Sequence, residues 1–209
     1  MPSPRTSRTD DGLTVKGQRT RQRIVEHAAQ LMFERGVAGT TIEDVRAAAG
    51  VSNSQVYHYF ADKHALVRAV IEYQTEYVVG PQESLFARLD TMDGLRAWRD
   101  FIVEHQRRRQ CRGGCPIASL SSELAEGDDD VRRQLSGSFA RWEHGIRDGL
   151  RAMHEAGRLR SEADPDELAL ATLASLQGGL LLTQLQRDVR PIATALDASL
   201  SLIAAHTTA

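Results

Sequence analysis

The chain has 209 residues, a net charge of −2 and an apolar fraction of 41%. This length allows one large domain or a small domain joined to a larger one, and the net charge excludes a chain that is basic throughout. No apolar run reaches the ~18 residues of a membrane helix, and the N-terminal arginines precede no apolar segment typical of a secretory signal. Two cysteines make no disulfide framework in a chain this long. We therefore expect a soluble, cytoplasmic protein with no membrane partner. Few prolines and the lack of alternating β-branched runs predict an all-α fold.

The first 17 residues are rich in Ser, Thr, Pro and Arg, which predicts a disordered arm. Such an arm either reaches DNA phosphates or the minor groove, or is a solvated tail. A helix is expected from Thr20, as a possible N-cap, to Gly36. Around its start lie the basic residues Lys16, Arg19, Arg21 and Arg23. A local basic patch of this kind matters more for DNA binding than the global charge.

Residues 40–63 predict two short helices joined by a tight turn. Thr41-x-x-Asp44 resembles a capping box that opens the first helix, although Asp replaces the usual Glu or Gln. Gly50 supplies the positive-φ residue that ends this helix. Ser52-x-x-Gln55 is a full capping box, so the second helix starts directly after Ser52. A helix, a glycine turn and a second helix with a polar outer face make a helix-turn-helix.

The second helix of such a motif enters the major groove of DNA, where its outward side chains meet base edges. Asn and Gln can read adenine with two hydrogen bonds, whereas Ser bonds several bases without discrimination. Double-stranded DNA is therefore the predicted partner. The residues expected to face bases are Ser52, Asn53, Ser54, Gln55 and Tyr57, and those suited to phosphates are Tyr57, His58, Tyr59 and Lys63. The weaker alternative is a plain helical hairpin inside an all-helical protein.

This stretch resembles the signature of the TetR family of bacterial transcriptional repressors. The resemblance covers about a quarter of the chain, from Arg21 to about Ile71, and its matching residues are Thr41, Val45, Ala48-Ala49-Gly50-Val51-Ser52, Tyr57-x-Tyr59-Phe60, Lys63 and Leu66. It implies that Thr41, Tyr57, Tyr59 and Lys63 contact the DNA backbone. Ser54 departs from the pattern, because many members have Gly there. Its side chain either adds a DNA contact or alters how closely the helix approaches.

The rest of the chain predicts further helices without a linker between domains. Asp62 to about Val79 is one helix, which Gly80-Pro81 ends or kinks. Caps and prolines then place helix starts after Thr91, at Pro116, near Asp129, at Asp164-Pro165 and at Pro191. Because the helix from Asp62 starts in the DNA-binding domain and continues beyond it, this helix is the natural lever between the two domains.

The helix that follows Asp164 is apolar around nearly its whole circumference and rich in small residues, so it should be buried. The TetR resemblance implies that this helix and the last one form a four-helix interface with their symmetry mates. On sequence alone, a monomeric bundle core explains the small residues nearly as well. A homodimer gains support because one helix-turn-helix rarely contacts enough DNA by itself. Two of them, one helical turn apart, match a palindromic operator.

Residues 112–185 also resemble one branch of the family, the regulators related to the lincomycin- and flavonoid-responsive repressors. The residues that carry this are Gly114-Cys115-Pro116-Ile117, Leu120, Glu123-Leu124 and Gln177-Gly178-Gly179. The branch implies a small apolar or aromatic effector, whose site needs apolar walls with a few polar groups. Its expected lining is Tyr73, Tyr77, Trp98, Ile102, His105, Phe139, Trp142, Ile146, Gln177 and Leu181. Singly, each is better explained as core; together, they favour a pocket.

Three alternatives remain open. Cys115 lies beside a predicted helix N-terminus, which should lower its thiol pKa and would suit a redox-sensing regulator. One small buried residue and one ordinary loop thiol explain the two cysteines better than this switch does, and Cys111-x-x-x-Cys115 is a poor spacing for a metal. An enzyme is disfavoured because the seven histidines are scattered and neither a nucleophile motif nor a phosphate-binding loop is present, so no catalytic residue or cofactor is predicted. An adaptor that has lost DNA binding is disfavoured by the polar residues of the recognition helix.

The sequence thus predicts a ligand-responsive, homodimeric transcriptional repressor. Residues 1–17 form the arm, 18–66 the helix-turn-helix domain, and 67–209 the effector-binding and dimerisation domain. An effector that favours a state with the two helix-turn-helix motifs too widely spaced would lower operator affinity by its differential affinity for that state.

Overall fold

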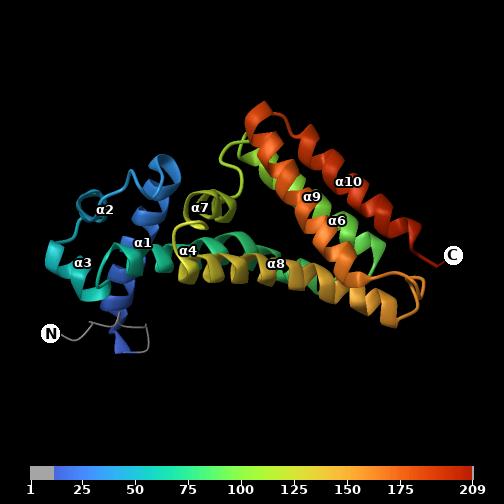
Figure 1. Cartoon of the computed structure of the whole chain (residues 1–209), viewed down its shortest axis with the longest axis horizontal. Coiled ribbons are helices and arrows are strands. Elements are labelled where there is room, and N and C mark those ends of the chain that lie inside the picture. Colours follow the sequence, from blue (N-terminus) through green and yellow to red (C-terminus); the bar gives the residue numbers. More distant parts are fainter. Residues whose placement is uncertain (1–11, 209) are drawn as a thin grey trace. The chain divides into compact units, whose positions relative to one another are not determined.

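The computed structural model describes residues 12–208, and within this range it is helical, with one isolated backbone bridge between Leu159 and Thr207 (Figure 1). The predicted all-α class is confirmed. The chain divides into two compact units. The first holds the chain up to Tyr77 together with Ser119–Leu135, and the second holds Val78–Ala118 and the chain from Ser136 onward. The predicted boundaries instead treat 67–209 as one domain.

The first unit begins with α1 (Val15–Arg35), α2 (Ile42–Ala49), α3 (Asn53–Tyr59) and α4 (Lys63–Val79). Helix α1 packs on both α2 and α3, as expected for the third wall of a helix-turn-helix. The apolar faces of these helices meet in a core whose side chains are at most 1% exposed: Ile24, Ala28, Val45, Val56, Phe60 and Leu66. This core fixes the outward direction of α3.

Helix α1 starts earlier than predicted. The predicted N-cap, Thr20, lies inside the helix, where its hydroxyl donates to the carbonyl of Lys16 at 3.0 Å. The cap is Thr14, whose side chain accepts from the N–H of Gly17 at 3.2 Å. The first turns of α1 carry Lys, Gln and Arg, which favour helix but give no apolar periodicity, so the sequence pattern begins too late. Residues 1–11 of the predicted arm lie outside the described residues.

The remaining elements are the 3₁₀ turn η2 (Gly80–Gln82), α5 (Glu83–Phe86), α6 (Met92–Arg108), α7 (Pro116–Leu124), α8 (Asp129–Glu155), α9 (Pro165–Gln186) and α10 (Arg190–Ala205). The predicted break at Gly80-Pro81 and the starts after Thr91, at Pro116, at Asp129 and at Pro165 are confirmed. Helices α4, α7 and α8 each run across the division between the two units.

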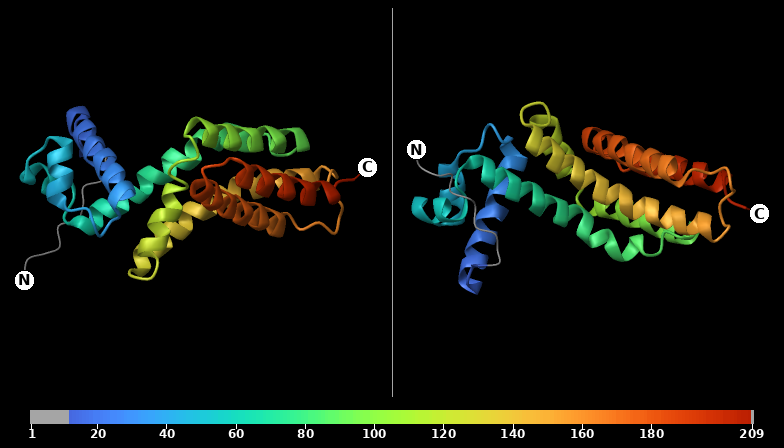
Figure 2. Two further views of the ribbon diagram at one scale, coloured as in Figure 1. Left: turned by 90° about the horizontal axis from the view of Figure 1, so that it is seen from above. Right: turned by 60° about the horizontal axis from the view of Figure 1, so that its bottom comes forward.

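In the second unit, α9 packs along α10, and α10 also contacts α6 (Figures 1 and 2). A Cβ at Gly179 would lie 2.9 Å from the Cδ1 atom of Ile192, so this glycine permits the close approach of α9 and α10. The N–H of Ile192 donates to the Thr183 hydroxyl at 3.0 Å. The small residues of α9 therefore have a packing role within one chain.

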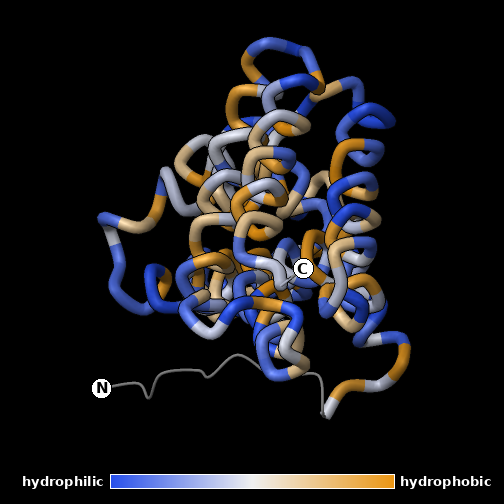
Figure 3. The backbone as a smooth tube through the Cα atoms, turned by 90° about the vertical axis from the view of Figure 1, so that its right-hand side faces the viewer, coloured by the Kyte–Doolittle hydropathy of each residue, from blue (hydrophilic) through white to orange (hydrophobic). Residues whose placement is uncertain are grey.

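Hydrophilic and hydrophobic residues alternate along the helices (Figure 3), as amphipathic packing requires. Helix α9 is different, because it is apolar around most of its circumference. By length and composition alone it could cross a membrane. However, 44% of its apolar window is already buried inside the fold, and the core helix of a soluble protein has the same composition. The predicted burial of α9 is thus partial: Leu170, Leu181, Leu182 and Leu185 remain 47–70% exposed.

Candidate nucleic-acid interface and effector region

Both predicted capping boxes of the helix-turn-helix are present. The Thr41 hydroxyl accepts from the N–H of Asp44 at 3.1 Å, and the Asp44 carboxylate accepts from the N–H of Thr41 at 2.9 Å. Hydrogen bonds from the Thr41 hydroxyl and then from its N–H lower the pKa of Asp44. Ser52 and Gln55 make the equivalent pair of bonds at 3.2 and 2.9 Å. These bonds fix the first turn of each helix.

Gly50 ends α2 in the left-handed conformation, with φ 62° and ψ 44°. Its N–H donates to the carbonyl of Ala47 at 3.3 Å. A side chain in this conformation would be strained even though a Cβ here would meet no atom within 4 Å. The turn therefore requires glycine for its backbone angle and not for space.

Helix α3 presents a polar face to solvent, made of the exposed residues Ser52, Asn53, Ser54, Gln55, Tyr57 and His58. Several of these polar groups are engaged locally. The side-chain oxygen of Gln55 accepts within the capping box, and the hydroxyls of Ser52 and Ser54 are 2.9 Å apart. Asn53 is exposed, and its side chain takes no part in either capping box. Among the predicted base contacts, Asn53 is thus the side chain whose amide is available without breaking a cap.

The predicted phosphate contacts differ in accessibility. The Tyr57 ring is 49% exposed, whereas Tyr59 is only 8% exposed and packs edge-on against His58 at 4.9 Å between ring centroids. Lys63 is half-buried, and its ammonium donates to the carbonyl of Val37 at 2.6 Å. An ammonium has three donors, so Lys63 retains donors beyond that bond. Thr41 is exposed at the start of α2.

Of the basic residues predicted near the start of α1, Lys16, Arg19 and Arg23 are exposed. Arg21 is half-buried, with its guanidinium 5.4 Å from the centre of the Phe60 ring. This cation–π geometry ties α1 to the end of α3.

A groove in the first unit brings the predicted effector residues Tyr73 and Tyr77 beside α1. Their rings stack at 6.4 Å between centroids with an interplanar angle of 20°. The groove has a volume of about 320 Å³ and is lined by Arg21, Gln22, Val25, Ala69, Glu72, Tyr73, Glu76 and Tyr77. Burial and then the nearby Glu26 raise the pKa of Tyr73. None of the other eight predicted effector residues lines this groove.

Those eight residues all lie in the second unit. Four of them, Trp98, Ile102, Trp142 and Ile146, are at most 6% exposed. The indole N–H groups of both tryptophans donate to Oε1 of Gln82, and the Gln82 amide donates to the carbonyl of Val78 at 2.7 Å. Sequence reasoning missed Gln82, since Gly-Pro-Gln predicts only a turn. The two indole N–H groups are thus already satisfied within the fold.

The other four predicted effector residues are more accessible. Phe139 and Gln177 are half-buried, His105 is exposed, and Leu181 is 57% exposed. Burial and then the neighbouring Arg109 and Arg108 lower the pKa of His105. Its ring stacks on Phe101 at 6.3 Å between centroids.

Gln177 has an unusual environment. Both terminal atoms of its amide are buried, and neither has a hydrogen-bond partner of good geometry within residues 12–208. The amide faces the Cys115 thiol, whose pKa it lowers as a hydrogen-bond donor; the amide oxygen has no such neighbour. An unsatisfied buried polar group costs about 1–3 kcal/mol, so the amide favours a polar partner from outside the fold.

The pKa of the Cys115 thiol shifts in the direction opposite to the one predicted for a redox-sensing thiol. Burial dominates and raises the pKa of the Cys115 thiol, although the N–H groups of Ala118 and Ile117 at the start of α7 act in the predicted, lowering direction. Desolvation disfavours the thiolate more strongly than the helix N-terminus favours it. Cys111 is buried as well, and both cysteines are free. The preferred alternative, in which one cysteine is buried and the other is an ordinary loop thiol, is half right, because both thiols are buried.

Two family models match the chain: that of bacterial regulatory proteins of the tetR family over residues 24–70, and that of the tetracyclin repressor-like C-terminal domain over residues 91–199. The second match alone covers more than half of the chain. The chain belongs to the TetR family. It is accordingly a DNA-binding transcriptional regulator and not an enzyme.

Relatives of similar length support this assignment. The HTH-type transcriptional repressor DhaR of Mycobacterium sp. (strain GP1) is 28% identical over 174 residues, which are 82% of this chain and 86% of that protein. The transcriptional regulator AcuR of Cereibacter sphaeroides is 26% identical over 82% of this chain and 79% of that protein. The crystal structure of a TetR regulator from Chloroflexus aurantiacus matches with a TM-score of 0.78 and 28% identity, over 93% of this chain and 98% of that one. The narrower resemblance to the lincomycin- and flavonoid-responsive branch stays a prediction.

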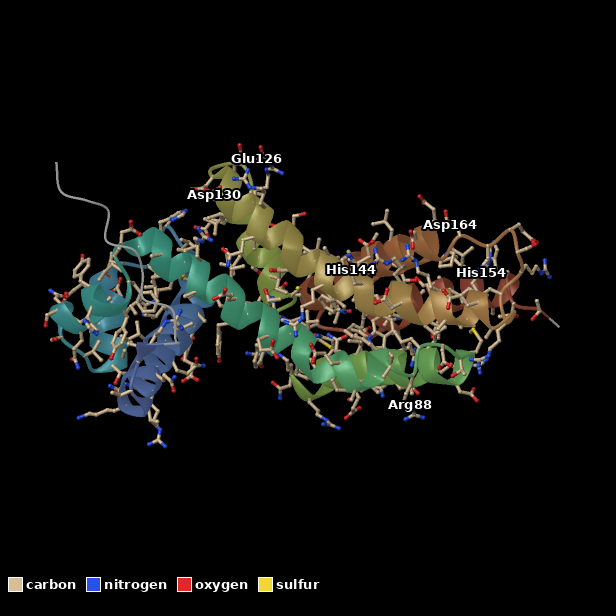
Figure 4. All side chains as sticks on the ribbon, turned by 90° about the horizontal axis from the view of Figure 1, so that it is seen from below. Arg88, Glu126, Asp130, His144, His154 and Asp164 are labelled. Carbon is tan, nitrogen blue, oxygen red and sulfur yellow. The ribbon has the colours of Figure 1, made fainter. Side chains whose placement is uncertain are left out.

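The histidines of this TetR protein do not assemble a site. His144 and His154 lie on different turns of α8 (Figure 4). Among residues 12–208, no group of three or more His, Cys, Asp or Glu side chains could hold a metal ion.

Proposed function

We propose that this TetR-family regulator is a homodimeric repressor that binds a palindromic operator in the cytoplasm and is released by a small effector. The observation that carries the proposal is the polar face of α3, held outward by two complete capping boxes and a buried core. In this motif that face reads the major groove. We assign base contacts to Asn53, Gln55 and Ser54, and backbone contacts to Thr41, Tyr57 and Lys63.

Exposed leucines on α9 support the dimer. Leu170, Leu181, Leu182 and Leu185 are 47–70% exposed, and Leu202 of α10 is 45% exposed. Exposed apolar side chains that form one contiguous surface are typical of an interface between proteins, and we infer that these leucines form such a surface. Gly178 belongs to the same exposed part of α9, and a Cβ there would meet nothing within 4 Å. One chain therefore does not require glycine at this position, whereas a closely packed partner helix would.

The effector site that we propose is centred on Gln177, because its buried amide oxygen lacks a partner within the described residues. An apolar or aromatic molecule with one hydrogen-bonding group would satisfy it while contacting apolar walls. The predicted neighbours Phe139 and His105 remain candidates for those walls. Leu181 fits the dimer face better, given its exposure. A redox-sensing regulator is the weaker candidate, because burial raises the pKa of the Cys115 thiol.

Selection of bound sequences from random duplex DNA tests the operator. We expect a palindrome with half-sites about one helical turn, or a multiple of it, apart. Binding that occurs only at low salt, with no enriched sequence, would contradict a specific repressor.

The selected duplex then tests the effector. Small aromatic and apolar compounds are screened for release of the labelled duplex, first with the wild-type protein. Gln177→Leu should keep operator binding and lose release, whereas Gln186→Leu, which changes an exposed glutamine at the end of α9, should behave as wild type. Equal release from wild type and Gln177→Leu would remove Gln177 from the site.

A further inference from the structure

The turn between α1 and α2 is held by a residue from outside the helix-turn-helix. Helix α1 ends at Gly36, with φ 77° and ψ 164°. The next two backbone N–H groups, those of Val37 and Ala38, both point to the carboxylate of Glu123 on α7. One oxygen accepts from Val37 at 2.7 Å and the other from Ala38 at 2.6 Å. Successive N–H groups in a turn form a concavity suited to an anion.

The same turn is bound from its other side. The carbonyl of Val37 accepts from the ammonium of Lys63, the first residue of α4, at 2.6 Å. The N–H and the C=O of Val37 are thus both held by charged side chains, and charge-assisted hydrogen bonds are shorter and stronger than neutral ones. Three residues after Ala38, the Thr41 cap begins α2. The position of the turn therefore sets where α2 starts, and through α2 where α3 points.

The carboxylate of Glu123 occupies the space that a side chain at position 36 would need. A Cβ at Gly36 would lie 3.1 Å from one oxygen of Glu123 and 3.4 Å from the other. Gly36 also has a positive φ, which disfavours any side chain. The glycine is thus suited both to ending α1 and to admitting Glu123.

Glu123 is separated from Val37 by 86 residues and lies in the part of the chain matched by the C-terminal family model, yet it packs in the same compact unit as the helix-turn-helix. We propose that Glu123 is a positioning residue for DNA recognition: its carboxylate fixes the α1–α2 turn and thereby holds the recognition helix in its DNA-binding orientation. Glu123 lies in the last turn of α7, so the end of this helix is hydrogen-bonded to the α1–α2 turn of the DNA-binding motif.

The test compares Glu123→Gln with Glu126→Gln. Glutamine keeps the shape of the side chain but removes the charge and presents an NH₂ group that cannot accept from a backbone N–H. Glu126 is an exposed glutamate at the turn after α7 (Figure 4), so it controls for the loss of one negative charge from the same surface. The readouts are the Kd for the selected operator, the melting temperature, the oligomeric state and hydrogen exchange at the amides of Val37 and Ala38.

We expect Glu123→Gln to raise the operator Kd about tenfold or more, within the range usual for coupled sites, with faster exchange at both amides. Its oligomeric state, and all readouts for Glu126→Gln, should stay close to wild type. The melting temperature of Glu123→Gln should fall by only a few degrees, as expected for the loss of two hydrogen bonds in a chain of this size, so the protein stays folded at the temperature of the binding assay. Glu123→Asp, which keeps the charge on a shorter side chain, should recover part of the affinity.

Faster amide exchange with an unchanged operator Kd would overturn the proposal, since the carboxylate would then cap the turn without positioning α3. An affinity loss that tracks a lower melting temperature and disappears on cooling would also overturn it, by reducing Glu123 to a stabilising residue. The proposal rests on the proposed operator binding, and the two failures differ: wild-type protein that enriches no sequence contradicts the proposed function, whereas specific wild-type binding that Glu123→Gln retains contradicts the role of Glu123.

Discussion

Trp98 and Trp142 donate their indole N–H groups to the same atom, Oε1 of Gln82, at 2.8 and 3.1 Å. The two rings come from α6 and α8, and the acceptor from the short turn η2. Both tryptophans are at most 2% exposed. This shared acceptor makes them part of the internal framework of the second unit, so the aromatic cluster that predicted an effector pocket has a structural role.

Replacing Gln82 with Leu should destabilise the second unit. Two buried indole N–H groups would lose their acceptor, and each unsatisfied buried donor costs about 1–3 kcal/mol, so we expect a loss of about 2–6 kcal/mol in total. Urea unfolding followed by tryptophan fluorescence measures it. Gln30→Leu, at an exposed position of α1, is the control and should change the midpoint little. A Gln82→Leu protein as stable as wild type would mean that water replaces the amide.

Contacts that the sequence made predictable are those between neighbours in the chain. Ser52 and Asp164 mark helix starts correctly because a cap is a bond between a side chain and the backbone two or three residues later. Pro116 marks one because proline at the first helical position loses no backbone hydrogen bond.

Contacts between distant segments were not predictable. The bond from Trp142 to Gln82 spans 60 residues and that from Val37 to Glu123 spans 86. Neither leaves a local pattern: Gln82 follows a turn signal, and Glu123 entered only as part of a family resemblance. The predicted direction of the Cys115 pKa shift was wrong for the same reason, because the burial that raises this pKa comes from tertiary packing.

Tyr57 and Lys63 should respond differently to replacement by Ala, although both are predicted backbone contacts. Tyr57→Ala removes a half-exposed ring, so we expect weaker operator binding at unchanged stability. Lys63→Ala removes a positive charge that would neutralise one DNA phosphate, so it should make the slope of log K against log salt shallower by about 1. It also removes the bond to the Val37 carbonyl, which should cost about 1–2 kcal/mol of stability.

Fluorescence anisotropy at several salt concentrations, with thermal unfolding in parallel, separates these effects. Two variants with the same stability and different affinities would show that the bond from Lys63 to Val37 contributes nothing to folding. Unaltered DNA binding by Tyr57→Ala would place the interface elsewhere.

Acid should weaken the start of α2 through Asp44. Hydrogen bonds from Thr41 lower the pKa of Asp44 below its ordinary value in the folded protein. A carboxyl group with a lowered folded-state pKa contributes stability above its unfolded pKa, near 4, and loses that contribution as the pH falls through the folded value. The difference in melting temperature between wild type and Asp44→Asn should therefore be constant near neutral pH and shrink below about pH 4.

The Thr41→Ala background provides the control for this titration. Without the hydroxyl that is the largest cause of the lowered pKa, the pH-dependent part of the Asp44→Asn effect should diminish. A difference that stays the same at all pH values in both backgrounds would mean that the capping carboxylate acts through shape and not through charge.

The exposed leucines of α9 should control dimerisation, and Leu185 is the most exposed of them at 70%. Burying a leucine side chain contributes about 1.5–3 kcal/mol, and a two-fold axis brings two copies of each residue into the interface. Leu185→Lys should thus raise the dimer Kd by about 10²–10⁴-fold, while the helical content of the monomer stays intact because the side chain makes little contact within one chain. Analytical ultracentrifugation across a concentration series measures the Kd.

Ala152→Lys, at an exposed position of α8, adds the same charge away from the proposed interface and should leave the dimer unchanged. If Leu185→Lys also remains a dimer at the lowest concentration, the exposed face of α9 is not the interface, and the leucines must be covered by something other than a second copy of this chain.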